Sequence, residues 1–237
     1  MMHQLSNNKI EAYVANQFDK LVHDDAMFPP SADKNDWEWQ AIIKELSELK
    51  GKKILDIGCG KGKFCQLFAQ SGAKPTGIDI SEELLRAAKK LAPTITYLVG
   101  SATNIPAKDG EFDVAICVEV LEHVPNLEKA IAEMARVLKK DGTLIIIDKN
   151  LYGLHPVWPY PAVIEKIWKE SHNQWMYPKD APYREKWFSP RKLKRDLSKE
   201  FSAVSVSYPV RSKFIGNTLK YAVAPWLSYD ALWKATK

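Results

Sequence analysis

The spacing of hydrophobic residues predicts helices in the first fifty positions. In residues 9–22 the apolar side chains recur at the three- and four-residue intervals of an amphipathic helix, and the Pro29–Pro30 pair ends that element. Residues 37–49 show the same spacing and run into Gly51, a residue typical of helix ends. We therefore expect two helices, separated by a polar linker, before residue 51.

The period of the pattern changes at residue 53, where short apolar runs begin to alternate with helical stretches. Strand-like runs occupy residues 53–57, 76–80, 95–99, 113–118 and 143–148. Helices are expected at residues 62–70, after Ser81 as an N-cap, and at residues 127–138, with a stop at Asp141–Gly142. Continuously apolar strands separated by helices are typical of a parallel sheet covered on both faces. Right-handed crossovers then make the predicted α/β fold doubly wound.

The alternation weakens after residue 150. Residues 151–188 are rich in proline and aromatic residues and show no clear period. Order returns at Ser189, which can cap a helix that has Pro190 in its first position. Strand-like runs follow at residues 203–210 and 231–235, and we expect the second of them to be a closing edge strand. Residues 214–227 are apolar without regular spacing.

Composition and charge narrow the class of protein. The chain has 237 residues, of which 46% are hydrophobic and 27% charged, so it fits the size of one globular domain. The net charge of +5 is unevenly distributed: residues 1–150 carry a net charge of −3 and residues 151–237 a net charge of +8. The three cysteines form no C-x-x-C pair, and we find neither a signal-peptide pattern nor an apolar run of about 20 residues. We expect a cytoplasmic protein without disulfides or a transmembrane segment.

The strongest chemical signal is a glycine-rich turn after the first predicted strand. Residues 54–62 read I-L-D-I-G-C-G-K-G, so a buried strand delivers an acid and then three glycines at alternate positions. Glycines at such a turn let a ligand approach the backbone closely. The dinucleotide fingerprint fails, since its third glycine would stand at Lys63, and no G-K-[ST] follows to make a P-loop. Asp79 ends the next strand about 20 residues on, the distance at which an acid meets a ribose in doubly wound folds.

These motifs resemble those of the class I S-adenosylmethionine-dependent methyltransferases. The resemblance covers residues 51–150 and includes D-I-G-C-G-x-G at 56–62, Asp79, G-S-A at 100–102, F-D-V at 112–114 and L-K-K-D-G-T-L at 138–144. The family more often has Asp at the position of Ser101. The segment E-V-L-E-H-V at 119–124 is similar to the ubiquinone-biosynthesis O-methyltransferase branch. The resemblance implies a mostly parallel seven-stranded sheet, S-adenosylmethionine as the cofactor, and methyltransferase activity.

The cofactor site that the resemblance implies follows the ends of the strands. Backbone groups of Gly58 and Gly60 would meet the methionyl carboxylate and ammonium, and Asp56 would help to position that ammonium. Asp79 would accept charge-assisted hydrogen bonds from both ribose hydroxyls. The predicted set comprises Asp56, Gly58, Cys59, Gly60, Gly62, Asp79, Ile80, Ser101, Ala102, Cys117 and Glu119. The alternative is that the glycines only permit a tight turn and that Asp79 is a solvated cap.

Three hypotheses compete for Glu119, Glu122 and His123, which lie at the carboxyl edge where open α/β sheets bind ligands. By resemblance to some relatives the three would bind a divalent metal, with His155 or His172 completing the set. Without a metal, His123 would act as general base for a hydroxyl group, because an ordinary histidine pKa of ~6.5 lets it accept a proton at neutral pH. In the third hypothesis Glu122 and His123 only shape the loop. We select His123 as the catalytic residue and predict no metal.

Residues 151–200 interleave aromatic with basic side chains and would lie over the mouth of the site. We expect one domain, with N-terminal helices and lid at 1–50, a cofactor-binding core at 51–150, an aromatic, basic substrate lid at 151–200 and closing strands at 201–237. The predicted acceptor is a small molecule, anionic or amphiphilic, methylated on a hydroxyl oxygen, with N- and C-methylation left open. The alternatives are an RNA or DNA methyltransferase, against which the missing [DN]-P-P-[YF] motif counts, and a noncatalytic S-adenosylmethionine-binding protein.

Overall fold

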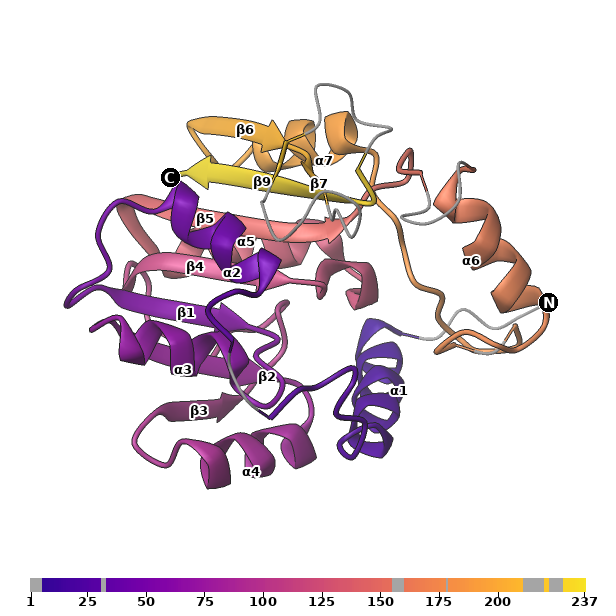
Figure 1. The fold of residues 1–237 in the computed structure, drawn as a ribbon, viewed down its shortest axis with the longest axis horizontal. Coiled ribbons are helices and arrows are strands. Elements are labelled where there is room, and N and C mark those ends of the chain that lie inside the picture. The colour runs from indigo at the N-terminus through magenta and orange to yellow at the C-terminus, as the bar shows by residue number, and fades with distance from the viewer. Residues whose placement is uncertain (1–5, 31–32, 155–159, 178, 211–219, 222–227) are drawn as a thin grey trace.

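Seven strands form one sheet in the computed structural model, which describes residues 6–30, 33–154, 160–177, 179–210, 220–221 and 228–237 (Figure 1). The strands are β1 (Lys53–Ile57), β2 (Lys74–Asp79), β3 (Thr96–Val99), β4 (Phe112–Val118), β5 (Leu138–Lys149), β6 (Ala203–Ser207) and β9 (Asp230–Thr236). Their order is β3-β2-β1-β4-β5-β9-β6, and β7 (Pro209–Val210) pairs separately with β8 (Lys220–Tyr221). The chain changes direction across the sheet between β1 and β4, the place where doubly wound folds bind ligands.

The sheet is mostly parallel, as predicted. Strands β1 to β5 pair in parallel, and only β9 runs antiparallel to both of its neighbours, β5 and β6. The prediction that residues 231–235 form an edge strand is wrong, because β9 lies inside the sheet and β6 takes the edge. Leu232 and Trp233 point to opposite faces of β9, and both are fully buried. A strand that buries apolar side chains on both faces suits an interior place.

Helices cover both faces of the sheet. The helices are α1 (Asn7–Lys20), α2 (Trp37–Glu45), α3 (Lys63–Gln70), α4 (Glu82–Leu91), α5 (Leu127–Val137), α6 (Ala162–Ser171) and α7 (Pro190–Leu197), with a short 3-10 turn, η1 (Leu121–His123). Helices α2 and α3 bury Trp39 and Phe68 in the core on one face. Helices α5 and α7 bury Met134 and Leu193 in the core on the other. The predicted two-faced coverage is confirmed.

Local sequence signals predicted the starts of most helices but the ends of fewer. The Ser81 hydroxyl caps α4 by accepting the Leu84 N–H at 3.1 Å, as expected. Ser189 precedes α7, with Pro190 as its first residue, but its side chain makes no capping bond. Helix α5 ends at Val137, one residue before the predicted Leu138, and the chain passes directly into β5. Asp141, with φ at 62°, instead turns the backbone inside the span of β5.

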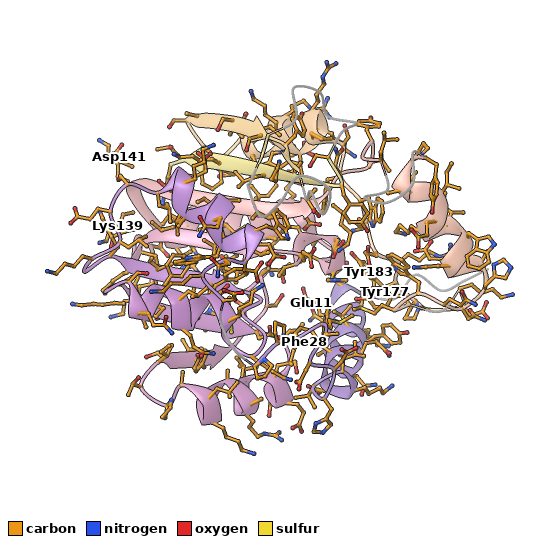
Figure 2. The ribbon with its side chains drawn as sticks, viewed as in Figure 1. Glu11, Phe28, Lys139, Asp141, Tyr177 and Tyr183 are labelled. Atoms are coloured by element: carbon orange, nitrogen blue, oxygen red, sulfur yellow. The ribbon has the colours of Figure 1, made fainter. Side chains whose placement is uncertain are left out.

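Two helices lie beyond the carboxyl ends of the parallel strands. Figure 1 shows α1 and α6 on that side of the sheet. Helix α6 lies in the segment after residue 150 for which no helix was predicted, and the irregular run at 214–227 falls outside the described residues except for Lys220–Tyr221. In Figure 2 Glu11, Phe28 and Tyr177 gather on this side, while Asp141 lies at the opposite end of the sheet. Among the described residues, no helix is long and apolar enough to cross a membrane.

Candidate functional site

The turn between β1 and α3 depends on glycine for both backbone angle and space. Gly58, Gly60 and Gly62 have left-handed φ values of 71°, 53° and 79°. A Cβ atom on Gly58 would lie 2.2 Å from a methyl carbon of Val120, and one on Gly60 would lie 3.1 Å from the Phe28 ring. A side chain at either position would therefore fill the space above the turn as well as strain the backbone.

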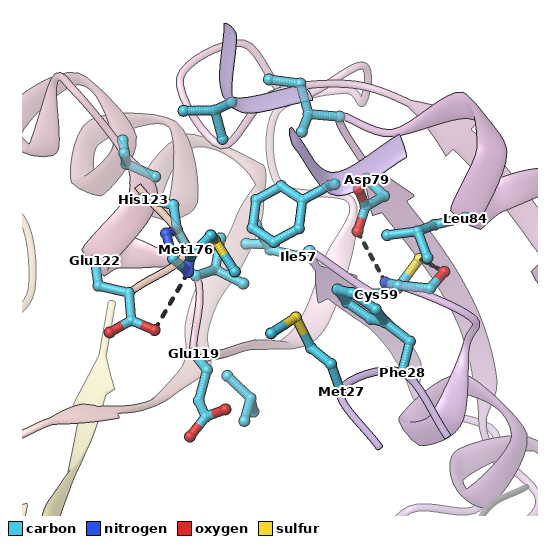
Figure 3. Close-up of a pocket in the computed structure, with 18 of the residues that line it drawn as sticks. Met27, Phe28, Ile57, Cys59, Asp79, Leu84, Glu119, Glu122, His123 and Met176 are labelled. Atoms are coloured by element: carbon cyan, nitrogen blue, oxygen red, sulfur yellow. Dashed lines mark hydrogen bonds and ion pairs between the residues drawn. The ribbon is translucent and has the colours of Figure 1, made fainter. Parts of the chain in front are cut away.

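Asp79 ends β2 directly beside this turn. One carboxylate oxygen accepts the Gly60 N–H and the other accepts the Ser81 N–H, both at 2.8 Å. Burial raises the pKa of Asp79, whereas the backbone N–H donors, including that of Ile80, act to lower it. Figure 3 shows the carboxylate beside the backbone that follows Cys59. Asp79 is thus a buried acceptor held in one orientation by the glycine turn.

A cavity of about 690 Å³ lies at the carboxyl edge of the sheet. This volume is typical of a small-molecule or cofactor site. Eight of the eleven predicted cofactor residues line it: Gly58, Cys59, Gly60, Asp79, Ile80, Ser101, Ala102 and Glu119. They follow the ends of the first four strands, so parallel pairing brings together residues that are up to 61 positions apart.

Three predicted cofactor residues lie behind the cavity wall instead. The Asp56 carboxylate accepts the Cys65 thiol at 3.4 Å inside the core, where burial raises its pKa to about 7. Cys117 is fully buried in the core on the α5 side of the sheet. A Cβ atom on Gly62 would lie 2.3 Å from the Tyr97 hydroxyl, so this glycine serves close packing. These three residues therefore do not line the cavity and pack within the turn and the sheet.

Helix α1 and the segment after it cover the glycine turn. Glu11 accepts the Thr103 hydroxyl at 2.6 Å, and Asp19 accepts the Ser81 hydroxyl at 2.6 Å. The remaining contact is an ion pair of 2.6 Å between Asp25 and Lys61. Each of these contacts joins the N-terminal segment to the loop after a different strand. Phe28 and Met27 line the cavity from the same segment (Figure 3).

The E-x-x-E-H segment holds a buried ion pair at the other end of the cavity. Glu122 lies in η1, and its Oε1 atom accepts the Lys149 ammonium at 2.5 Å and lies 3.3 Å from Nε2 of His123. Burial acts to raise the pKa of Glu122, but the positive charge of Lys149 and the His123 ring hold it down at about 2. Glu122 is therefore an anion fixed beside His123.

Both ring nitrogens of His123 are engaged by side chains. Nε2 faces Glu122, and Nδ1 lies 2.9 Å from the hydroxyl of Tyr177, which reaches η1 from the segment after α6. The ring itself lines the cavity and packs edge-on against Phe18. His123 thus faces the cavity as predicted, but any hydroxyl that used Nδ1 would have to take the place of Tyr177.

The residues that could gather around a cation differ from the predicted metal set. Glu185 joins Glu122 and His123, with one potential ligand atom of each within 4.8 Å of the others, and Glu119 stands apart. His172 ends α6 and bonds Ser171 at the surface, while His155 lies outside the described residues. Because the Lys149 ammonium already neutralises Glu122, the arrangement fits a divalent metal poorly.

Glu185 is a cavity residue that sequence reasoning missed, whereas Trp175 belongs to the aromatic segment that was expected over the site. The two carboxylate oxygens of Glu185 accept the indole N–H groups of Trp175 and Trp187 at 2.8 and 2.6 Å. Burial raises the pKa of Glu185 to about 7, and the nearby charge of Glu122 adds to that shift. In the sequence Glu185 is one of six acids in the aromatic and basic segment 151–200, and no local pattern marks it out. The basic residues of that segment favoured the hypothesis of an anionic ligand rather than a functional role for the acid Glu185.

The basic residues near the cavity are committed to acids. Lys61 pairs with Asp25, Lys149 with Glu122, and Lys169 with Glu165 at 2.6 Å. Lys63 bonds the carboxylates of both Asp36 and Glu38. The basic residues of α7, by contrast, are exposed: Arg191, Lys192, Lys194 and Arg195. The excess of basic residues at 151–237 therefore does not give the described cavity a positive potential that would attract anions.

The central part of the chain is similar in sequence to known methyltransferases. Residues 55–146 match a family model described as a methyltransferase domain. The ubiquinone biosynthesis O-methyltransferase of Thiobacillus denitrificans is 41% identical over 113 residues, which are 46% of this chain and 49% of the relative. The demethylmenaquinone methyltransferase of Paenarthrobacter aurescens is 31% identical over 139 residues, or 54% and 55% of the two chains. The chain thus spans about half the length of these relatives.

A solved structure extends the likeness of fold over nearly the whole chain. A methyltransferase from Thermotoga maritima, described as S-adenosylmethionine-dependent and as a possible histamine N-methyltransferase, superposes with a TM-score of 0.72 at 23% identity. The match covers 94% of this chain and 99% of that one. Residues 55–146 therefore match a methyltransferase family model, and the chain shares the fold of a solved methyltransferase.

Proposed function

We propose that this protein transfers the methyl group of S-adenosylmethionine to a hydroxyl oxygen of a small molecule bound in the cavity. The observation that carries the proposal is the presence, in one cavity, of the glycine turn with Asp79 and of His123 beside Glu122. The sulfonium group of the cofactor supplies an electrophilic methyl group. The protein therefore contributes mainly by orienting the two reactants in line.

The residues at the glycine turn fit this cofactor. A ligand can meet the backbone at Gly58 and Gly60 because neither residue carries a side chain, and Val120 and Phe28 form part of the same cavity wall. Asp79 offers a fixed carboxylate to the ribose hydroxyls, and Ser101 and Ala102 lie on the next loop of the cavity, where the adenine edge is expected. Asp79 would exchange part of its bonding to Gly60 for charge-assisted bonds to the ligand.

His123 is the proposed acceptor of the hydroxyl proton. A carboxylate cannot donate a hydrogen bond, so Glu122 favours the tautomer that carries its proton on Nε2 and leaves Nδ1 able to accept one. The Tyr177 hydroxyl at 2.9 Å from Nδ1 shows the distance that an acceptor hydroxyl would adopt in its place. The name of the Thiobacillus denitrificans relative, an O-methyltransferase, supports oxygen as the methylated atom.

A polynucleotide acceptor has less support from the charge distribution. The exposed basic residues lie on α7, which packs against β6 and β9, whereas the cavity is lined by Glu11, Glu119 and Glu185 among other acids.

We also propose that the chain is one domain, supported by β6 and β9 completing the sheet that β1 to β5 begin. Three buried free cysteines support a reducing, cytoplasmic location.

The test is methyl transfer to a set of phenols and alcohols, with the products identified by mass spectrometry. A hydroxyl acceptor should gain one methyl group in the presence of S-adenosylmethionine. His123→Ala should lower turnover by about 10²- to 10⁴-fold while leaving cofactor affinity nearly intact. Full turnover by His123→Ala would remove His123 from the mechanism, and methylation confined to nitrogen or carbon would contradict the hydroxyl proposal.

A further inference from the structure

One buried oxygen in the cavity wall lacks a hydrogen-bond partner. Glu122 is 1% exposed, and its Oε1 atom bonds Lys149, but its Oε2 atom meets no donor among the described residues. A buried carboxylate oxygen without a donor is costly, and native structures normally supply one. Since Glu122 lines the cavity, a bound molecule is the natural source of that donor.

A second carboxylate lies close to that of Glu122. Glu185 and Glu122 place carboxylate oxygens within 4.8 Å of each other, and both residues line the cavity. The indole donors of Trp175 and Trp187 hold the Glu185 carboxylate in place. Two buried carboxylates so close together repel each other. Because the Lys149 ammonium neutralises only one of them, Glu122, one further positive charge between them would balance the pair.

The charge of the whole cavity has the same sign as this pair. Its walls contain the carboxylates of Glu11, Asp36, Glu38, Asp79, Glu119, Glu122 and Glu185, against the ammonium groups of Lys61, Lys63, Lys149 and Lys169 and the ring of His123. All four lysines already pair with a carboxylate, so none is left to hold an anionic ligand. Aromatic rings of Trp37 and Trp175 also line the walls, and such faces attract organic cations.

We propose that the methyl acceptor carries an ammonium group, which binds between the carboxylates of Glu122 and Glu185. This inference rests on the proposed function and adds the charge of the substrate to it. An ammonium offers three N–H donors, enough to reach Oε2 of Glu122 and an oxygen of Glu185 together. Its charge offsets the excess of acids, and the Trp175 ring packs beside it. The acceptor is thus an amine that also bears a hydroxyl group.

The test compares three phenols that share a two-carbon side chain and differ in its terminal group and charge. Tyramine is positive, 4-(2-hydroxyethyl)phenol is neutral and 3-(4-hydroxyphenyl)propionate is negative. Each is titrated by calorimetry into the full chain saturated with S-adenosylhomocysteine. We expect tyramine to bind about tenfold or more tightly than the neutral phenol, which corresponds to one charge-assisted hydrogen bond, and the propionate to bind most weakly.

Glu185→Gln should remove most of the preference for tyramine, because the amide keeps the size of the side chain and loses its charge. Asp141→Asn, at the opposite end of the sheet, is the matched control and should keep the preference. Equal affinities for the three phenols in the unsubstituted protein, or no binding of tyramine at about 10 mM, would overturn the inference even if Glu185→Gln failed to fold. So would a Glu185→Gln protein that still preferred tyramine. Failure of S-adenosylhomocysteine itself to bind would instead count against the proposed function.

Discussion

The glycine turn allows a prediction in which two substitutions differ in one contact only. Gly51 and Gly58 share a left-handed backbone, with φ at 75° and 71°. A Cβ atom on Gly51 would meet nothing within 4 Å, whereas one on Gly58 would lie 2.2 Å from the Val120 side chain. Replacing either glycine by alanine adds backbone strain of about 1–2 kcal/mol. The stiff, β-branched Val120 cannot move aside freely, so Gly58→Ala adds overpacking of about 1–3 kcal/mol.

Urea denaturation followed by tryptophan fluorescence measures both effects, since the chain has eight tryptophans. The free energy of unfolding of Gly58→Ala should lie below that of Gly51→Ala by the overpacking alone, about 1–3 kcal/mol. Adding Val120→Ala to Gly58→Ala should recover part of the loss. Gly58→Ala should also bind S-adenosylhomocysteine more weakly than Gly51→Ala does. Equal stability of the two alanine variants would refute the close approach of Val120 to the turn.

Further predictions concern charge. Because burial raises the pKa of Asp56 from 3.8 to about 7, the folded state holds a proton that the unfolded state releases, so stability falls as pH rises across that window. Asp56→Asn should flatten this dependence by up to about 1.4 kcal/mol per pH unit in thermal unfolding; an unchanged pH profile would contradict the shift. Glu122→Gln leaves the buried Lys149 ammonium without its main counter-charge and should cost about 3–5 kcal/mol in urea denaturation, unlike Asp141→Asn. Duplex RNA should bind weakly through α7, with an affinity that falls steeply as salt rises; sub-micromolar binding at physiological salt would favour the nucleic-acid alternative.

Local sequence signals were sufficient for the parallel part of the sheet and for the glycine-turn end of the cavity. The strand at residues 53–57 and the turn after it lie within one short segment, and Asp79 follows at a spacing set by one βαβ unit. The carboxyl ends of parallel strands meet at one edge, so predicting the strands also predicted that Gly60, Asp79 and Ser101 would converge. The apolar pattern also indicated which residues of the central sheet would be buried.

The acceptor half of the cavity depends on contacts that no local pattern encodes. Glu185 meets Glu122 across 63 positions of chain, and Tyr177 reaches His123 from an irregular segment. The helix at 162–171 carries exposed apolar residues such as Ile167, so it lacks the clean amphipathic spacing by which helices are recognised. The position of β9 inside the sheet is likewise set by pairing with β5 and β6 rather than by its own sequence.

Every role proposed for the cavity depends on the cofactor binding at the glycine turn with its ribose on Asp79. This binding is tested by calorimetric titration of S-adenosylhomocysteine into the unsubstituted protein, Asp79→Asn and the distant control Asp141→Asn. Losing the charge at Asp79 should weaken binding about ten- to hundredfold, as expected for a charge-assisted hydrogen bond, while the control matches the unsubstituted protein. Equal affinity in Asp79→Asn, or no binding to the unsubstituted protein, would contradict the account.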